Sequence, residues 1–70
     1  MKIAVLGAGM VGRAIALDLA NNYQVTSFDI HSSNLELLKS TNSAVQTIKA
    51  DLSEYQQYGR WLQPFDMIVT

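Results

Sequence analysis

Several residue types are scarce in this chain of 70 residues, and each shortage excludes a class of protein. Cysteine is absent, so neither a disulfide framework nor a thiolate zinc site is available. The single histidine, His31, argues against a histidine-based metal centre, and we expect no metal site. A chain of this size buries only about 60–65% of the surface that its unfolded form exposes. It therefore forms at most one domain.

Charge and long apolar runs are also scarce. Charged residues make up 16% of the chain, and 5 basic residues against 6 acidic ones leave a net charge of −1. This balance predicts no basic surface for nucleic acid or for a membrane. The apolar opening, residues 1–6, ends at Gly7 and is too short for a signal peptide or a spanning helix. With 49% hydrophobic residues, a globular cytoplasmic protein is the expectation.

What the chain does contain is an alternation of short apolar runs with amphipathic segments. Residues 3–6 form a continuous apolar run that ends in glycines, which is typical of a strand buried on both faces. Val11, Ile15 and Leu19 then recur at helical spacing. We predict strands at 3–6, 24–29, 44–50 and 65–70. Helices are predicted at 10–21, after Ser32 or Ser33 as the capping residue, and from Ser53, also a candidate cap, to about Leu62.

This alternation predicts an α/β fold with a parallel sheet, because strands joined through helices make right-handed crossovers. The expected architecture is a partial, Rossmann-like doubly wound sheet with strand order 3-2-1-4. The first two helices should lie on one face and the third alone on the other. The fourth strand, with Met67, Ile68 and Val69, should lie at an edge. Apolar edges favour association, so we expect the isolated chain to associate with itself there or through the less covered face.

A glycine pattern follows the first strand and indicates nucleotide binding. It reads Gly7-Ala8-Gly9-Met10-Val11-Gly12, between a predicted strand and a predicted helix. Gly7 would make the tight turn, Gly9 would let a pyrophosphate approach the backbone, and Gly12 would let the helix pack closely. The unpaired amides at the start of the helix, where Met10 and Val11 stand, would then face the phosphates. We take all of these residues except Ala8 as candidates for cofactor contact.

Asp29 predicts which dinucleotide is bound. It ends the second strand, 20 residues after Gly9. A carboxylate at this place can accept hydrogen bonds from the ribose hydroxyls and would repel a 2′-phosphate. No arginine or lysine follows it before Lys39, so NAD(H) is favoured over NADP(H). Ile30 is expected along the adenine face, and Asp51 either reaches the adenine amino group or is an exposed acid beside a helix cap.

The sequence also resembles a known family, the saccharopine dehydrogenases and the related lysine 6-dehydrogenases. The resemblance begins in residues 1–20, where the run Gly12-Arg13-Ala14-Ile15-Ala16 matches a helix of that family, and it extends through residues 45–53 and 65–70. Its sharpest motif is shared with many Rossmann enzymes. In that family the first domain continues to further strands, and a substrate domain follows. The resemblance therefore implies that residues 1–70 are the first half of a Rossmann dinucleotide-binding domain, part of a longer chain.

The leading functional hypothesis is the NAD(H)-binding segment of an amino-acid dehydrogenase that acts on a C–N bond. In that case the substrate would be a small amino acid, and the longer protein would be an NAD(P)-dependent oxidoreductase. We identify no acid–base residue in the chain, so no catalytic residue is assigned and the chain alone is expected to be inactive. The alternative is a regulatory nucleotide-sensing module, such as the gating domain of a potassium-uptake system. An FAD-binding half-domain is a poorer match because flavoproteins usually have glutamate at the Asp29 position.

Overall fold

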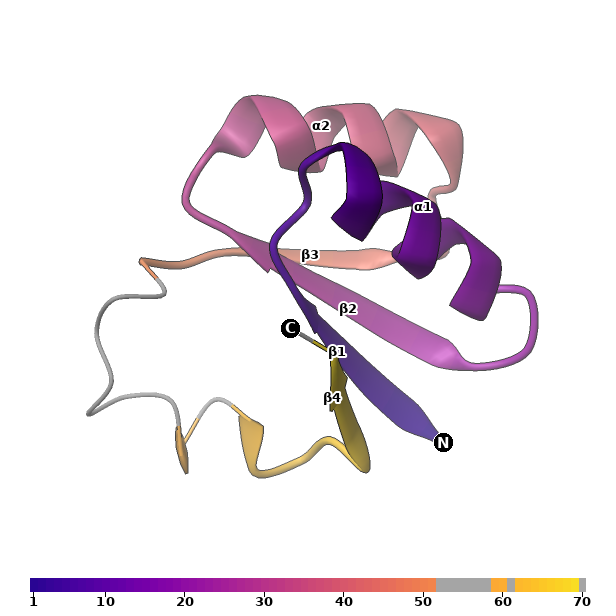
Figure 1. The fold of residues 1–70 in the computed structure, drawn as a ribbon, viewed down its shortest axis with the longest axis vertical. Coiled ribbons are helices and arrows are strands. Elements are labelled where there is room, and N and C mark those ends of the chain that lie inside the picture. The colour runs from indigo at the N-terminus through magenta and orange to yellow at the C-terminus, as the bar shows by residue number, and fades with distance from the viewer. Residues whose placement is uncertain (52–58, 61, 70) are drawn as a thin grey trace.

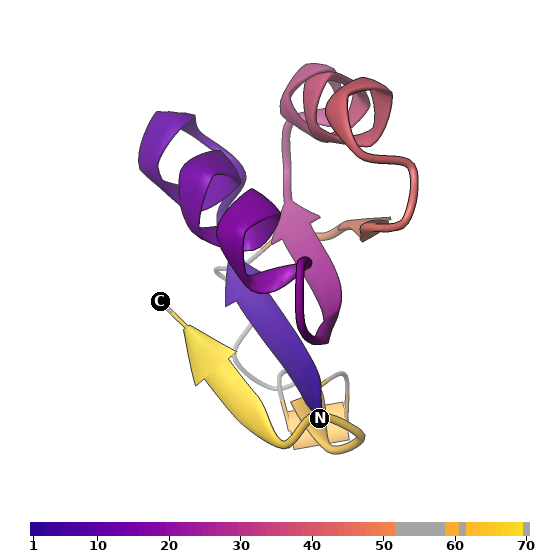
Figure 2. The ribbon, with the colours of Figure 1, turned by 90° about the vertical axis from the view of Figure 1, so that its right-hand side faces the viewer.

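The computed structural model describes residues 1–51, 59–60 and 62–69. In this part of the chain, one parallel sheet has the order β3-β2-β1-β4, built from β1 (Lys2–Leu6), β2 (Gln24–Asp29), β3 (Gln46–Lys49) and β4 (Met67–Val69). Helices α1 (Met10–Leu19) and α2 (Ser32–Thr41) lie together on one side of it (Figure 1). Figure 2 shows the same two helices on one side of the sheet, in a view turned by 90°. The predicted strand order, and the placement of the first two helices on one face, are confirmed.

The side of the sheet beneath the helices holds the larger apolar core. Side chains alternate along β1, so Ile3 and Val5 face the helices, whereas Ala4 and Leu6 face the opposite side. The other buried members of the helical-side cluster are Ala8, Ala16, Val25, Leu35, Leu38 and Val45. Burial stabilises the fold by about 1.5–3 kcal/mol for each large aliphatic side chain. This core holds β1, α1 and β2 together as one unit. The candidate site lies next to it, at the carboxyl ends of β1 and β2.

The opposite side of the sheet has a smaller core. Its members are Ala4, Leu6, Phe28, Ala50, Leu62 and Phe65. The rings of Phe28 and Phe65 meet edge to face with their centroids 5.8 Å apart, which is a favourable aromatic geometry. Ile48 and Ile68 pair in register with Phe28 and Ala4, so they lie on this same side, and both are exposed. Among the described residues, this face is the less covered of the two.

Several element boundaries differ from the predictions, and local hydrogen bonds explain them. Helix α1 ends at Leu19 rather than at residue 21, because the N–H groups of Asn21 and Asn22 donate three residues back, to the carbonyls of Asp18 and Leu19, and not four residues back as in an α-helix. Strand β3 begins at Gln46 rather than at residue 44. The Val45 N–H donates to the Asn42 carbonyl, and the Val45 carbonyl accepts from Lys39 Nζ at 2.9 Å, so this residue is bound to the end of α2 and the turn that follows it.

The remaining differences concern the two ends of the chain and the second helix. Strand β1 starts one residue early, at Lys2, and β4 covers only Met67–Val69 of the predicted 65–70. The cap of α2 is His31, so Ser32 is its first helical residue and neither predicted serine caps it. The third predicted helix falls mostly outside the described residues, including Ser53, Tyr58 and Trp61, although residues 59, 60 and 62 are helical.

Ser27 is a polar residue in the middle of β2, and it lowers the stability of the core. Its side chain is fully buried, and its Oγ has no hydrogen-bond partner within the described ranges. An unsatisfied buried hydroxyl costs about 1–3 kcal/mol. We therefore expect Ser27→Ala to raise the free energy of unfolding by about 1 kcal/mol in chemical denaturation. Ser40→Ala is the control, because Ser40 Oγ is exposed and donates to the Leu37 carbonyl. A clear loss of stability in Ser27→Ala would contradict this prediction.

Candidate dinucleotide-binding site

The loop from β1 to α1 is shaped by two of its three glycines. Gly7 has a φ of 102°, a conformation that L side chains rarely adopt. Its N–H donates to the Phe28 carbonyl at 2.7 Å, which carries the β1–β2 pairing into the loop. At Gly12 a Cβ would collide with the Gly7 carbonyl oxygen, and it would lie 2.9 Å from the carbonyl carbon. The first turn of α1 therefore packs directly on the loop, as the sequence pattern predicts.

Gly9 differs from the other two glycines because it combines open surroundings, which Gly12 lacks, with a negative φ, which Gly7 lacks. It caps α1 with a φ of −69° and a ψ of −169°, and a Cβ there would meet no atom within 4 Å. No side chain makes a capping hydrogen bond at this end of α1, and the first turn carries no acidic residue. The amide groups and the positive end of the helix dipole are thus directed to open space beside a side-chain-free residue. This is the arrangement that a pyrophosphate group requires.

A cavity of about 400 Å³ lies against this loop, where β1 and β4 end. Its lining is apolar apart from the backbone and consists of Val5, Leu6, Gly7, Gly9, Met10, Val11, Gly12, Ile15 and Val69. The side chains of Met10 and Val11 are 81% and 72% exposed, which is unusual for large apolar residues. The carboxyl end of a parallel sheet is where doubly wound folds bind their ligands.

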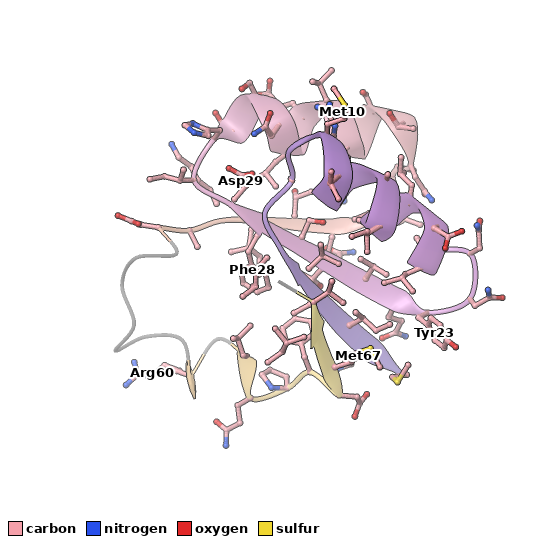
Figure 3. The ribbon with its side chains drawn as sticks, viewed as in Figure 1. Met10, Tyr23, Phe28, Asp29, Arg60 and Met67 are labelled. Carbon is pink, nitrogen blue, oxygen red and sulfur yellow. The ribbon has the colours of Figure 1, made fainter. Side chains whose placement is uncertain are left out.

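Asp29 lies between the starts of the two helices, as Figure 3 shows. It is only 7% exposed, although it is the last residue of its strand. Its Oδ2 accepts from the Ala8 amide in the glycine loop at 2.7 Å, and its Oδ1 accepts from the His31 amide at the start of α2, also at 2.7 Å. The Asn34 side chain is a third donor, with Nδ2 3.4 Å from Oδ2. One carboxylate therefore joins the glycine loop to the second helix.

These contacts keep Asp29 ionised. Burial by itself raises the pKa of the carboxyl group, and it is the largest single influence, but the amide donors of His31 and Ala8 lower the pKa. The Asn34 side chain and the charge of the nearby imidazole act in the same direction, so the pKa lies below its ordinary value of 3.8. The group is a charged acceptor at neutral pH, as ribose recognition requires.

Asp29 should make the stability of the fold depend on pH in the acid range. Because its folded pKa is below 3.8, its contribution is fully present above that value and is lost as the pH falls through the folded pKa. We expect the wild type to be more stable than Asp29→Asn at about pH 6, and this difference to shrink towards about pH 2. Denaturation of both proteins across this range is the measurement. A stability difference that does not change with pH would show that the charge is not what stabilises the fold.

The other predicted site residues, Ile30 and Asp51, lie at the same edge of the sheet as Asp29. Ile30 follows Asp29 and is about half exposed at the same edge of the sheet. Asp51 is partly exposed and follows Ala50, whose N–H donates to the Asp29 carbonyl, so it also lies at the carboxyl edge. Sequence reasoning missed Asn34, and the signal that could have found it is a polar side chain in the first helical turn after the acid.

Other features of the molecule do not compete with this site. A hollow of about 580 Å³ lies at the amino ends of the strands, beside Lys2, Tyr23, Gln24 and Phe65, and none of the predicted site residues lines it. No group of three metal-binding side chains occurs in the described ranges. Among the helices that the structure describes, none is long and apolar enough to cross a bilayer.

A parallel sheet with a glycine loop after β1 and an acid at the end of β2 defines a dinucleotide-binding domain. The chain belongs to one family of such domains: residues 2–66 match the model described as 3-hydroxyacyl-CoA dehydrogenase, NAD binding domain. NAD is the cofactor of this family, and the preference predicted from Asp29 agrees with it.

Several chains among the solved structures are similar to this one, and two of them show the extent of the likeness. One is a 3-hydroxyacyl-CoA dehydrogenase from Archaeoglobus fulgidus, with 28% identity and a TM-score of 0.65, and the match covers 73% of this chain and 20% of that one. The other is the PbgP3 protein from Burkholderia pseudomallei, with 17% identity and a TM-score of 0.72 over 96% of this chain and 21% of that one. At 17% identity the second shows the fold alone. This chain thus spans about a fifth of the length of either structure. No curated protein matches it.

These comparisons support the predicted cofactor-binding function and the class of enzyme, but not the predicted amino-acid substrate. An NAD-binding Rossmann segment of a dehydrogenase is confirmed by the family match. The resemblance to saccharopine dehydrogenases gains no support, because the family that matches is of the 3-hydroxyacyl-CoA type. The run that carried the resemblance lies in α1, where Gly12 packs closely against the Gly7 carbonyl and Ala16 is buried in the core.

Proposed function

We propose that this chain binds NAD(H) through its glycine loop and Asp29, as the first half of the cofactor domain of a 3-hydroxyacyl-CoA dehydrogenase. The observation that carries the proposal is the 2.7 Å hydrogen bond from the Ala8 amide to Asp29 Oδ2. This hydrogen bond connects the glycine loop, which would bind the phosphates, to Asp29, which would bind the ribose, so the two form one site. The family match supports the substrate class, and the substrate-binding and catalytic residues belong in this proposal to the remainder of a longer protein.

Each candidate residue has a separate task in this site. Gly9 leaves room for the pyrophosphate, and the amides at Met10 and Val11 begin the helix whose dipole faces it. Asp29 accepts from the adenosine ribose, and Ile30 and Asp51 flank the adenine at the same edge. Bound NAD supplies hydride transfer at its nicotinamide ring. The described residues that line the cavity include no ionisable side chain, so their contribution is binding, orientation and exclusion of water.

Calorimetric titration of the whole protein with NADH tests the binding step. The second step is an assay of NADH oxidation with a 3-oxoacyl-CoA, and in parallel with the keto acid and amine partners of an amino-acid dehydrogenase. We expect NADH to bind and to be consumed with the thioester alone. Turnover only with the amino-acid substrates would instead support a dehydrogenase acting on a C–N bond. Binding of NADH without turnover of either substrate would support the regulatory nucleotide-sensing module.

Two further expectations are part of this proposal. We propose that the isolated chain associates with itself through β4, and the exposure of Met67 and Ile68 on this strand supports it. Within the described sheet β4 pairs only with β1, so its other edge is open to a second strand. Sedimentation equilibrium at micromolar concentration is the test, and a stable monomer would contradict the idea. The cytoplasm is the proposed compartment, on the sequence argument alone.

A further inference from the structure

Asn34 is the one side chain that donates a hydrogen bond to the Asp29 carboxylate among the contacts of the described residues. Its Nδ2 lies 3.4 Å from Oδ2, and the other two donors are the main-chain amides of Ala8 and His31. Asn34 is half-buried in the first turn of α2. Its own N–H donates to the His31 carbonyl at 3.2 Å, so the backbone that carries this side chain is fixed against the residue that caps the helix.

The two oxygens of the carboxylate are not equally occupied. A carboxylate offers about four acceptor positions, two on each oxygen. Ala8 and Asn34 take both positions on Oδ2, whereas His31 takes one on Oδ1. The position that these contacts leave is therefore on Oδ1, the oxygen on the side of His31. A ribose hydroxyl that arrives at Asp29 is directed to that oxygen.

We propose that Asn34 is a specificity-determining positioning residue, which holds Oδ2 together with the Ala8 amide and so presents Oδ1 to the adenosine ribose. The inference rests on the proposed binding of NAD(H) at this site. Discrimination against a 2′-phosphate needs a negative charge at a fixed place, because a carboxylate that can rotate can also turn away from the phosphate. The two main-chain amides each donate to a different oxygen of the carboxylate, and the Asn34 side chain adds a third hydrogen bond that opposes its rotation.

The ionisation of Asp29 agrees with this role. The Asn34 side chain is one of the groups that lower the pKa of the Asp29 carboxyl group, against the effect of burial. The other titratable group that acts on it is the His31 side chain, at the start of the same helix. Removal of Asn34 should therefore change both the orientation of the carboxylate and its affinity for a proton.

Three variants of the whole protein separate this role from simple space filling. Asn34→Leu keeps the approximate shape of the side chain and removes its donor, and Asn34→Ala removes both. Ser33→Ala is the matched control, because Ser33 is the exposed neighbour in the same helical turn and donates to no atom of Asp29. The measurements are the dissociation constants of NADH and NADPH by calorimetry and the Asp29 carboxyl pKa by carbon-13 NMR of the unliganded protein.

We expect Asn34→Ala and Asn34→Leu to reduce the preference for NADH over NADPH by about two- to tenfold, the effect of one hydrogen bond. Both should raise the Asp29 pKa, whereas Ser33→Ala should change neither value. Restoration by leucine would show that Asn34 only fills space, and an unchanged preference and pKa in both variants would overturn the inference. If the wild type binds no dinucleotide, the proposed function fails instead, and the NMR titration still decides whether Asn34 holds the carboxylate.

Discussion

Gly9→Val is expected to abolish NADH binding and to leave the fold intact. A valine at this position would fill the space that the pyrophosphate needs, so we expect affinity to fall by about a hundredfold or more, equivalent to about 2.7 kcal/mol. The fold should tolerate the change, because Gly9 has an ordinary negative φ and open surroundings. Calorimetric titration gives the affinity, and the free energy of unfolding shows that the variant is folded. Undiminished binding would refute the role of the glycine loop.

Gly12→Ala is the contrasting control within the same motif. The new methyl group would collide with the Gly7 carbonyl, which is backbone and cannot turn aside as a flexible side chain can. Overpacking of this kind costs about 1–3 kcal/mol, and we expect a value near the upper end. Gly12→Ala should therefore lose stability first and binding as a consequence. If both variants behave alike, the division between a binding glycine and a packing glycine is wrong.

The second large effect is expected from a change of the cofactor preference. Asp29→Ser combined with Ile30→Arg removes the charge that repels a 2′-phosphate and adds a cation that binds it. A charge-pair change of this kind is worth about 1–3 kcal/mol, so the ratio of NADPH to NADH affinity should rise about 5- to 150-fold. Ile30 suits the arginine because it is exposed and follows Asp29 directly. Calorimetry with both nucleotides measures the ratio.

The same substitution also removes an acceptor that the fold uses. Asp29 accepts hydrogen bonds from Ala8, His31 and Asn34, so the double variant should also be less stable than the wild type. Asp29→Ser alone is the control that separates the lost charge from the added cation. It should reduce NADH affinity and raise NADPH affinity by less than the double variant does, because it removes the repulsion of the 2′-phosphate without adding a cation that binds it. Tighter binding of NADPH than of NADH by the unmodified protein would contradict the whole account of Asp29.

The main features of the site could be predicted from the sequence because they depend on short-range rules. The motif predicts two local features of the backbone: the positive φ at Gly7 and the close approach of α1 to the loop at Gly12. The strand order follows from the alternation of strands and helices. The dehydrogenase family could not be predicted in the same way, because the residues that carried the resemblance serve the packing of α1, which many such domains share.

Other features depend on contacts that cross from one element to another, and these were not predictable. Ser32 and Ser33 suggest a helix cap, but both lie inside α2, and the Asp29 carboxylate binds the amide of His31, the residue that caps the helix. Val45 has the composition of a strand residue, yet Lys39 of α2 holds its carbonyl. Asn34 gives no signal in the sequence beyond its polarity, because its partner lies five positions away in another element.

The locality of the Asp29 contacts has a consequence for the order in which the protein assembles during synthesis. The carboxylate and all three of its donors lie within the first 34 residues, and the longest of these contacts, Ala8 to Asp29, spans 21 positions. The contact from the Lys2 amide to Asp66 Oδ2, which brings β4 beside β1, spans 64 positions. Closing a short loop costs less entropy than closing a long one, and domains fold progressively as the chain emerges from the ribosome. We therefore expect the hydrogen bonds around the Asp29 carboxylate to form on the nascent chain before β4 pairs with β1 and completes the sheet.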